Sequence, residues 1–401
     1  MNLLVINYMV LPLPPVKGGA VEYLVDSFLE YNEQYHFHNF VVYSIYDEEA
    51  EKESKKYKYA DFRFIKIQGI YDKINRLVRH LINKIPNVYV GNLYISKIIK
   101  SEKSLDKYDA IIIENAPEFG LVLPKKYRNK MILHLHNDYL NSKTKKAKET
   151  FNCYEKIYTI SDSLGDCVQT IKKSEKVVTL YNGIDLKRFA FSTENRLRLR
   201  QKYNISDNDF VFMYCGRIVP DKGVYEMVKA FSEIEGNNIK LLIVGGTGYS
   251  KNNETDYMKK IKKIDDKRII FTGFVRYDEI EELYSVADVG MVPSIFNDPF
   301  NLTVIEFCSN GIPVIISDRG AMKELVNGNC SIIAKCDDNF SDNINAAMKY
   351  MLDNKGKINE MGKEAKCISE NYGIDRYCDN FNNLLTKFRE EINYGKKELL
   401  D

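Results

Sequence analysis

The chain has 401 residues, which exceeds what one hydrophobic core usually supports, so two domains are predicted. Its content of 44% hydrophobic and 28% charged residues is that of an ordinary globular protein and argues against a largely disordered chain. The formal charge of +2 is unevenly spread: residues 1–190 carry 29 basic and 23 acidic side chains, the remainder 29 and 33. The first part is therefore the better suited to meet an anionic surface.

The chain shows no sign of export or of a membrane span. No apolar run approaches the roughly 18 residues that a spanning helix needs. The first fifteen residues lack a basic segment and run into prolines, so a buried strand is favoured over a signal peptide. The eight cysteines are scattered without a CxxC pair, which indicates free thiols in a reducing cytoplasm rather than a disulfide framework or a zinc site.

Short apolar strands alternate with helical stretches along the chain. The strands expected in the first part cover residues 2–7, 39–46, 110–115, 131–136, 156–161 and 176–182, and the first helix begins near Val21. After a polar interval at 189–208, strands follow at 210–215, 240–245, 268–273, 288–294 and 313–317. Such strands, joined by helices, indicate parallel sheets covered on both faces.

Two doubly wound α/β domains are therefore predicted, at residues 1–190 and 191–373. An amphipathic helix at 374–401 could pack on either of them, including by crossing back to the first. Two basic segments stand out in the first domain. Residues 72–103 combine an excess of lysine and arginine with apolar residues at helical spacing, and the loop NSKTKKAK follows Asn141.

These basic segments admit two interpretations. The first is peripheral association with an anionic membrane, where each cationic group near the lipid contributes about 1 kcal/mol. The second, which is the commoner arrangement for such a helix, is an ordinary helix with one face in the core and one in solvent.

Glycine pairs and cations follow several strands. Gly18 and Gly19 lie between the first strand and its helix, where backbone amides can approach a phosphate. In FMYCGRIVPDKGV, Arg217 and Lys222 stand between a strand and a helix, the place where open α/β sheets bind ligands. Two cations beside a helix start suit a diphosphate.

The sequence HLHND, which ends at Asp138, suggests a metal site at first sight. Such sites need further histidines, and the five in this chain end at His136, so no metal is expected. On an alternating strand His134 and His136 share a face. His136 lies nearer the carboxyl end and is our candidate for proton handling, with a structural histidine as a nearly equal alternative.

The most informative segment is NDPFNLTVIE, from Asn297 to Glu306. Pro299 is expected to start a helix, since proline fits the first turn, and the free amides there form an anion site. Asp298 and Glu306 would then lie a little over two helical turns apart. One acid would reach a sugar and the other a group beyond its phosphates.

Taken together, these segments resemble the retaining nucleotide-sugar glycosyltransferases of the GT-B architecture, specifically family 4. The resemblance covers nearly the whole chain. It rests on the motifs GGAVE, HLHN, TISDSL, LYNGIDLKRF, CGRIVPDKG, FTGFV, DPFNLTVIEFCSNGIPVI and DRGAMKEL, in that order. The fold it implies is two Rossmann-like domains that face each other across a cleft.

The resemblance also implies roles for individual residues. The donor diphosphate would meet Arg217, Lys222, Gly19 and the amides of Leu302 and Thr303. The ribose would meet Glu306, the base would meet the backbone near Val275, and the transferred sugar would meet Asp298, His136, Phe300 and Asn301. The family usually has Glu where Asp298 stands and Gly where Asn301 stands.

The implied activity is transfer of a sugar from a nucleoside diphosphate, UDP being favoured, to a lipid-linked or growing surface polysaccharide. The step needs no metal or other cofactor and no nucleic-acid partner, and the enzyme would be cytoplasmic or peripheral on the inner membrane face. Two alternatives stay open: a non-catalytic sugar-binding or activating subunit, and a GT-B epimerase or phosphorylase.

Overall fold

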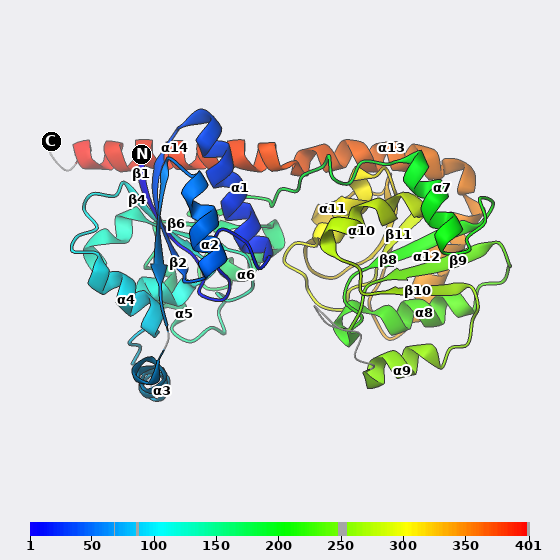
Figure 1. The fold of residues 1–401 in the computed structure, drawn as a ribbon, viewed down its shortest axis with the longest axis horizontal. Helices are drawn as coiled ribbons and strands as arrows, with labels where there is room; N and C mark the ends of the chain where they lie inside the picture. The colour runs from blue at the N-terminus through cyan, green and yellow to red at the C-terminus, as the bar shows by residue number, and fades with distance from the viewer. Residues whose placement is uncertain (68, 86–87, 248–254, 399–401) are drawn as a thin grey trace. The chain divides into compact units, whose positions relative to one another are not determined.

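The computed structural model describes residues 1–67, 69–85, 88–247 and 255–398. The chain divides into two compact units (Figure 1), each with a sheet between helices. Unit 1 comprises Met1–Gly183 and Asp375–Asp401, and unit 2 comprises Ile184–Ile374.

In the described part of unit 1, seven parallel strands form one sheet in the order β3-β2-β1-β4-β5-β6-β7. The order reverses between β1 and β4, so the carboxyl ends of these two strands form a switch point. The strands are β1 (Asn2–Ile6), β2 (Asn39–Ile45), β3 (Ala60–Ile65), β4 (Ala110–Glu114), β5 (Met131–Leu135), β6 (Lys156–Thr159) and β7 (Val177–Thr179). The α-helices are α1 (Ala20–Tyr35), α2 (Glu48–Glu53), α3 (Ile70–Asn83), α4 (Leu93–Ser101), α5 (Ala147–Phe151), α6 (Asp162–Gln169) and α14 (Ile374–Glu398).

The C-terminal helix α14 packs on unit 1, one of the two positions that its amphipathic pattern allowed. Phe381 lies 4.6 Å, centroid to centroid, from Phe28 of α1. Asn382 Oδ1 lies 2.9 Å from His38 Nε2, and Glu391 pairs with Lys156. The chain therefore returns to its first unit to complete that core.

In the described part of unit 2, six parallel strands form a sheet in the order β10-β9-β8-β11-β12-β13, with its switch point between β8 and β11. The strands are β8 (Phe210–Cys215), β9 (Ile239–Val244), β10 (Ile269–Gly273), β11 (Val289–Val292), β12 (Val314–Ser317) and β13 (Ser331–Ala334). The α-helices are α7 (Thr193–Lys202), α8 (Val224–Ser232), α9 (Asp256–Lys262), α10 (Tyr277–Leu283), α11 (Leu302–Ser309), α12 (Phe340–Asp353) and α13 (Ile358–Ser369).

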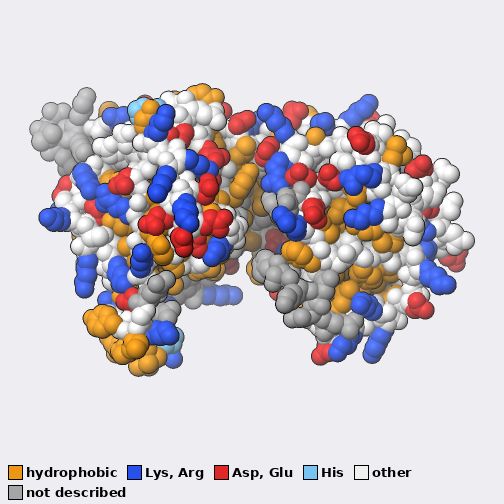
Figure 2. Space-filling model, in the orientation of Figure 1, with side chains coloured by type: hydrophobic (Ala, Val, Ile, Leu, Met, Phe, Trp, Pro, Cys, Tyr) orange, Lys and Arg blue, Asp and Glu red, His pale blue; other side chains and the backbone are white. Residues whose placement is uncertain are grey.

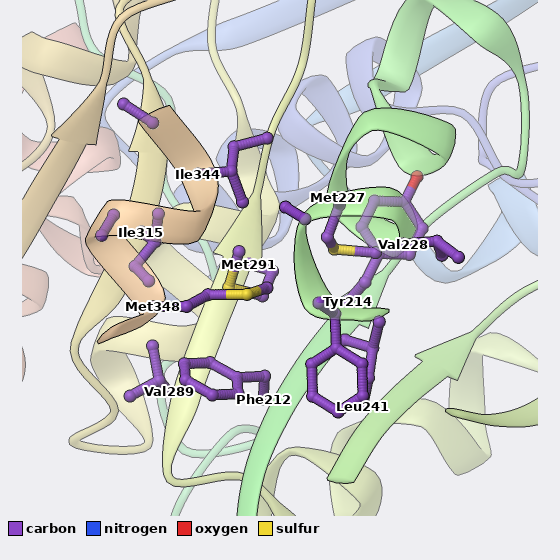
Figure 3. Close-up of a cluster of buried hydrophobic side chains, with 14 of the residues drawn as sticks. Phe212, Tyr214, Met227, Val228, Leu241, Val289, Met291, Ile315, Ile344 and Met348 are labelled. Atoms are coloured by element: carbon purple, nitrogen blue, oxygen red, sulfur yellow. The ribbon is translucent and has the colours of Figure 1, made fainter. Parts of the chain in front are cut away.

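The core of unit 2 joins the sheet to the helices α8 and α12. Phe212 and Met291 of the central strands are fully buried, as are Met227 of α8 and Met348 of α12 (Figure 3). Fully burying a side chain of this size contributes about 1.5–3 kcal/mol, so this cluster holds β8 and β11, and hence the ends of both strands, in place.

The division between the units falls at Gly183 and Ile184, a few residues before the boundary predicted at 190. The segment that follows belongs to unit 2 because it packs there. Ile184 bridges Gly373, and the Phe189 ring meets the Tyr284 ring edge-on at 5.4 Å. The polar interval that suggested a later boundary contains α7.

Two edge strands were not anticipated. β3 alternates charged and apolar residues and is mostly half-buried, and β13 has four residues. Neither shows the continuous apolar run by which the central strands were recognised. The strands predicted at the other positions are all present.

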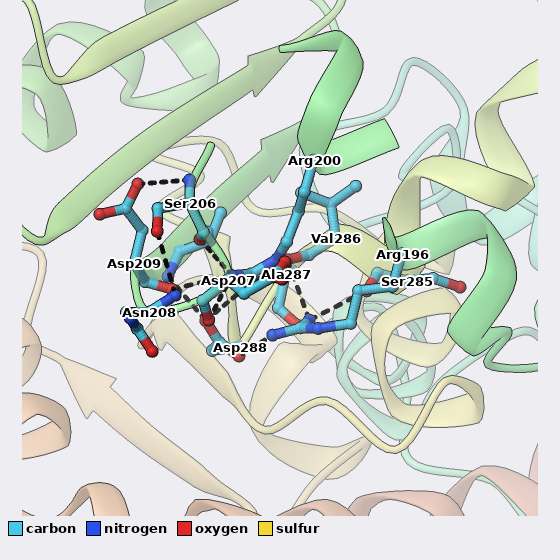
Figure 4. Close-up of polar contacts among 11 residues, drawn as sticks. Arg196, Arg200, Ser206, Asp207, Asn208, Asp209, Ser285, Val286, Ala287 and Asp288 are labelled. Carbon is cyan, nitrogen blue, oxygen red and sulfur yellow. Dashed lines mark hydrogen bonds and ion pairs between the residues drawn. The ribbon is translucent and has the colours of Figure 1, made fainter. Parts of the chain in front are cut away.

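The segment Asp207–Asp209, directly before β8, forms a turn. The buried guanidinium of Arg200 donates to the carbonyl of Ser206 at 3.1 Å and to that of Asp209 at 2.9 Å (Figure 4). The same side chain donates to Asp288 at 3.0 Å, just before β11. Arg200 thus ties α7 to the turn before β8 and to the start of β11.

All eight cysteines are free, and six of them are buried, which confirms the absence of a disulfide framework. Within the described residues, every helix is too short or too polar for a bilayer span.

Candidate functional site

A cavity of about 200 Å³ lies at the carboxyl ends of β8 and β11, the switch point of unit 2. Most of its lining comes from the end of β8 and from the loop that links β11 to α11. The lining residues are Tyr214, Cys215, Gly216, Lys222, Val292, Pro293, Ser294, Asp298, Phe300, Asn301, Leu302 and Thr303. Six of these were predicted site residues: Lys222, Asp298, Phe300, Asn301, Leu302 and Thr303.

Asp298 is held from two sides at the mouth of this cavity. Lys222 Nζ donates to Asp298 Oδ1 at 2.9 Å and to Oδ2 at 2.8 Å. Asn301 Nδ2 donates to Oδ2 at 3.0 Å. The carboxylate is 9% exposed, so its charge is balanced by the ammonium rather than by bulk water.

The helix that follows begins later than the sequence suggested. α11 starts at Leu302, with Asn301 as its N-cap, so the prediction that Pro299 starts the helix is wrong. The backbone of Asn301 is extended, with a φ of −96° and a ψ of 100°, so the helical backbone begins only at Leu302. The Asn301 side-chain amide donates to Asp298 and does not cap the helix. Asp298 therefore precedes α11, and the expected helical relationship between Asp298 and Glu306 does not hold. The amides of Leu302 and Thr303 nevertheless lie at the helix start and line the cavity.

Two glycines allow the loops around Asp298 to pack closely. Gly320 has a φ of 57°, and a Cβ there would lie 2.3 Å from the carbonyl oxygen of Asp298. Gly223 has a φ of 66°, and a Cβ there would lie 2.0 Å from the carbonyl oxygen of Pro293. Both positions combine a left-handed backbone with a contact that excludes any side chain. The motifs CGRIVPDKG and DRGAMKEL thus serve to hold Lys222 and Asp298 together.

Glu306 lies deeper in unit 2 and outside the residues that line the cavity. It accepts a hydrogen bond from the hydroxyl of Tyr284 and is 7% exposed. Burial raises the pKa of Glu306 to about 7, against the opposing effects of the Tyr284 hydrogen bond and of Arg188. Cys215, which does line the cavity, feels the Glu306 charge, and burial followed by that charge raises its pKa to about 12.

Two other predicted contacts of the nucleotide are outside the cavity lining. Arg217 follows β8 directly and is exposed, with its carbonyl oxygen accepting the Tyr214 hydroxyl at 2.7 Å. Val275 is half-buried in the loop after β10, two strands away from β8. Both lie at carboxyl ends of strands of the same sheet, as their sequence positions implied.

Unit 1 holds a second group of polar side chains at its own switch point. His136 Nε2 lies 3.0 Å from Glu114 Oε2, and His134 Nδ1 lies 3.0 Å from the same oxygen. The two imidazole centroids are 4.1 Å apart, which confirms that both histidines occupy one face of β5. All three side chains are buried.

The protonation states in this group follow from burial and mutual charge. Burial alone would raise the pKa of Glu114, but the two imidazoles outweigh it and lower that pKa to about 2. Burial, followed by the His134 charge, lowers the pKa of His136 to about 4. At neutral pH the group is thus a carboxylate facing a neutral His136, which donates through Nε2 and keeps Nδ1 as an acceptor.

The glycine pair lies beside this group. Gly19 is the N-cap of α1 with a φ of 110°, and a Cβ there would lie 2.2 Å from Glu22 Oε2. Glu22 is buried, and burial raises its pKa to about 7, with a contribution from Glu114. Gly19 and His136 therefore belong to unit 1, whereas the other predicted site residues belong to unit 2.

The sequence argument against a metal considered histidines alone. Glu114, His134 and His136 bring three groups able to hold a cation to within 4.8 Å of one another. Histidine nitrogen and carboxylate oxygen are ligands that zinc accepts. The expectation of a metal-free enzyme accordingly stays a prediction.

Three residues of these sites were missed, namely Glu22, Glu114 and Tyr284, and His134 was considered but not chosen. Glu22 is the acid of GGAVE, and Glu114 is the acid that ends AIIIE. An acid next to an apolar run indicates a strand end that faces a ligand or a partner. Tyr284 lies between predicted elements and gave no comparable signal.

Residues 195–367 match the family described as glycosyl transferases group 1. The Bacillus subtilis protein YtcC is 24% identical over 89% of this chain and 84% of its own. The lipopolysaccharide 1,2-N-acetylglucosaminetransferase of Salmonella typhimurium is 27% identical over 57% of this chain and 59% of its own.

Among solved structures, Anabaena HepE in complex with UDP superposes with a TM-score of 0.73 at 17% identity, over 96% of this chain and 100% of that chain. At that identity the likeness concerns the fold. The two parallel-sheet units, the family match and the relatives agree with the resemblance of the motifs. The chain is therefore a glycosyltransferase of the GT-B fold, and its residues 195–367 match the glycosyl transferases group 1.

Proposed function

We propose that this enzyme transfers a sugar, with retention of configuration, from a UDP-sugar to a lipid-linked or growing surface polysaccharide. The observation that carries the proposal is the cavity of unit 2, where the Lys222 ammonium and Asp298 lie beside the amides that start α11. Related proteins support the donor and the acceptor. HepE has been solved with UDP and with UDP-glucose, and one relative is a capsular polysaccharide glycosyltransferase of Staphylococcus aureus.

The cavity suits the diphosphate and sugar portion of such a donor. Its volume of about 200 Å³ is below the roughly 300–1,000 Å³ of whole-ligand pockets, so it would hold only part of a nucleotide sugar. Lys222 and the Leu302 and Thr303 amides supply positive charge where the leaving UDP becomes more negative. We assign them, with Arg217 and Gly19, to the diphosphate, and Phe300 and Asn301 to the sugar.

In the proposed step, the bond between the anomeric carbon and the β-phosphate oxygen breaks while the acceptor oxygen bonds to that carbon on the same face. The acceptor proton passes to the departing phosphate oxygen, so atoms and charges balance without a protein nucleophile. Asp298 and His136 contact the transferred sugar, and Glu306 accepts from the ribose hydroxyls. The base lies against the backbone near Val275. No metal enters this step, because the cation and the helix amides already provide the charge.

The test is release of UDP from a panel of UDP-, GDP- and dTDP-sugars by the purified protein, with the anomer of the product followed by NMR. Slow hydrolysis of one donor class without an acceptor is the expected result. A non-catalytic subunit would release nothing from any donor. An epimerase would change the configuration of the donor sugar, with its nucleotide either kept or exchanged. It would not glycosylate an acceptor.

A further inference from the structure

Helix α3 of unit 1 turns its polar face toward the protein. Lys97 donates to Asp72 Oδ2 at 2.9 Å. Arg79 Nη1 donates to the Val90 carbonyl at 2.8 Å, and Val90 N donates to Asn83 Oδ1 at 2.8 Å. These contacts all come from one side of the helix, because residues 72, 79 and 83 lie within about 40° of one another around its axis. Specific polar contacts therefore set the orientation of α3.

The opposite face of α3 is apolar and exposed. Of the nineteen large hydrophobic side chains that are exposed among the described residues, seven lie on α3 or directly after it. They are Ile70, Tyr71, Ile74, Leu77, Val78, Leu81 and Ile85, with exposed fractions from 47% to 78%. Figure 2 shows these apolar side chains gathered over α3, at the lower end of unit 1. The interpretation of this helix as one with its apolar face in the core is thus wrong.

A basic rim borders this apolar face. Lys73, His80 and Lys84 are exposed on α3. The lysine-rich loop after Asn141 reaches the same place, where Lys145 Nζ donates to the carbonyl of Asn83 at 2.9 Å. The acid on α3, Asp72, is buried and already paired with Lys97. The two basic segments, which are separate in the sequence, therefore meet on one surface of unit 1.

We propose that α3 and the loop of residues 141–146 dock unit 1 on the surface of an anionic lipid bilayer, with α3 lying in the plane of the interface and its apolar face among the acyl chains. An apolar arc bordered by cations, here along one side, is a pattern of helices that lie on such a surface. The inference rests on the proposed function in one respect, namely that the bilayer would carry the lipid-linked acceptor. The binding itself requires neither donor nor acceptor.

A bilayer fits this surface better than a second copy of the chain does. Two copies that paired through α3 would bring Lys73, His80 and Lys84 of one copy near those of the other, and the polar rim around the apolar arc holds no exposed acid on α3 to offset them. Anionic head groups neutralise such a rim while the acyl chains cover the arc.

The test is flotation of the full-length protein with vesicles that contain phosphatidylglycerol, compared with vesicles of phosphatidylcholine alone. The wild type is expected to float with the anionic vesicles and to do so less in high salt. The variant Ile74→Ser, Leu77→Ser, Leu81→Ser should lose at least about tenfold in vesicle partition, because three apolar anchors are removed from exposed positions. Lys143→Gln and Lys145→Gln should each lower partition about fivefold.

A matched control removes three exposed apolar side chains from unit 2: Leu197→Ser, Ile333→Ser, Tyr350→Ser. This control should float like the wild type. Thermal unfolding and calorimetric UDP binding, measured for all variants, show that each is folded and separate a failure of docking from a failure of the proposed transfer.

Three outcomes would overturn the proposal. The wild type could fail to bind anionic vesicles, or the α3 variant could bind them as well as the control does. The third is a dimer of the wild type in light scattering without lipid that the α3 variant converts to a monomer, which would assign the apolar face to a second copy of the chain.

Discussion

Lys222 donates to both carboxylate oxygens of Asp298, although 76 residues separate them in the chain. The pair joins the loop after β8 to the loop after β11 at the mouth of the unit 2 cavity. Because the Lys222 ammonium has three donor hydrogens and contacts both carboxylate oxygens of Asp298, a diphosphate that approaches the start of α11 competes with Asp298 for Lys222. The two residues therefore do not act independently in donor binding.

This competition predicts that two substitutions, each of which removes one charge of the pair, differ in their effect on UDP affinity. Lys222→Gln should raise the Kd for UDP by about 10- to 150-fold, the equivalent of the 1.5–3 kcal/mol of a charge-assisted hydrogen bond. Asp298→Asn should leave the Kd for UDP unchanged or lower it, because Lys222 is released, while kcat falls by a similar factor through loss of the sugar contact. Calorimetry with UDP and steady-state kinetics separate the two quantities.

The controls for this pair are Lys222→Arg and Asp298→Glu, which keep the charges. Asp298→Glu restores the residue that the family usually has, so it should retain substantial activity. Equal losses of UDP affinity in Lys222→Gln and Asp298→Asn would contradict the competition and indicate a purely structural ion pair.

Glu306 predicts a pH dependence of nucleotide binding. Burial raises its pKa to about 7, so the carboxyl is largely protonated at pH 6 and ionised at pH 8. Ribose hydroxyls donate more strongly to the ionised form. UDP affinity should therefore rise by up to about tenfold between pH 6 and pH 8. In Glu306→Gln the part of this rise that Glu306 contributes should disappear.

The Glu306→Gln variant is also the control for the ligand, since the UDP phosphate titrates in the same range in both proteins. Glu306→Ala should lower productive donor use by about 10- to 150-fold. The folding stability of the protein without ligand depends on pH in the opposite direction from its UDP affinity. A carboxyl whose pKa is raised contributes stability at low pH that is lost as the pH rises from 4.5 to 7.

Much of the cavity could be predicted because its parts follow apolar strands. The apolar runs of β8 and β11 predict buried strands. The glycine, proline and cations that follow them indicate the strand ends, where open α/β sheets bind ligands. The Lys222–Asp298 pair could not be predicted, because no local pattern reports a contact across 76 residues. The start of α11 was misplaced because proline at the head of an apolar run is compatible with a first helical turn, and no local pattern reports the extended backbone of Asn301.

The orientation of α3 shows another limit of sequence reasoning. Helical spacing identified an apolar face, but the same spacing occurs in helices that bury this face and in helices that expose it. The polar contacts of Asp72, Arg79 and Asn83 with residues 90 and 97 decide between them. Those contacts depend on tertiary structure rather than on the periodicity of the helix.

Truncation of the Arg200 side chain is expected to cause a large loss of folding stability. Its guanidinium is 1% exposed and donates to Asp288 and to several backbone carbonyls of unit 2. Arg200→Ala leaves these acceptors unsatisfied and Asp288 partly unpaired, which should cost about 3–5 kcal/mol. Chemical unfolding measures the change. The neighbouring Arg198→Ala, an exposed position on the same helix, should cost below about 1 kcal/mol.

We expect the group of Glu114, His134 and His136 in unit 1 to lower the stability of the protein in acid. His136, with its pKa lowered to about 4, disfavours folding as the pH falls from 6.5 to 4, because the unfolded chain takes up the proton first. Glu114, with its pKa lowered to about 2, contributes stability that is lost as the pH falls from 4.5 to 2. Titration of His136 and Glu114 should thus lower stability below pH 6.5, and comparison of the melting temperatures of Glu114→Gln and the wild type should show that the variant lacks the lower part of this contribution. An unchanged pH profile in that variant would contradict the assigned charge of Glu114.

Chelation tests whether the unit 1 group holds a metal. Glu114 Oε2 lies 3.0 Å from a nitrogen of each histidine, and the two imidazoles already stabilise the Glu114 charge without a cation. Extended dialysis against EDTA should therefore leave UDP release and the melting temperature unchanged, and elemental analysis should find no stoichiometric zinc or manganese. Loss of activity that zinc restores in the wild type, but not in Glu114→Gln or His136→Ala, would instead make these side chains ligands and would place a metal in unit 1.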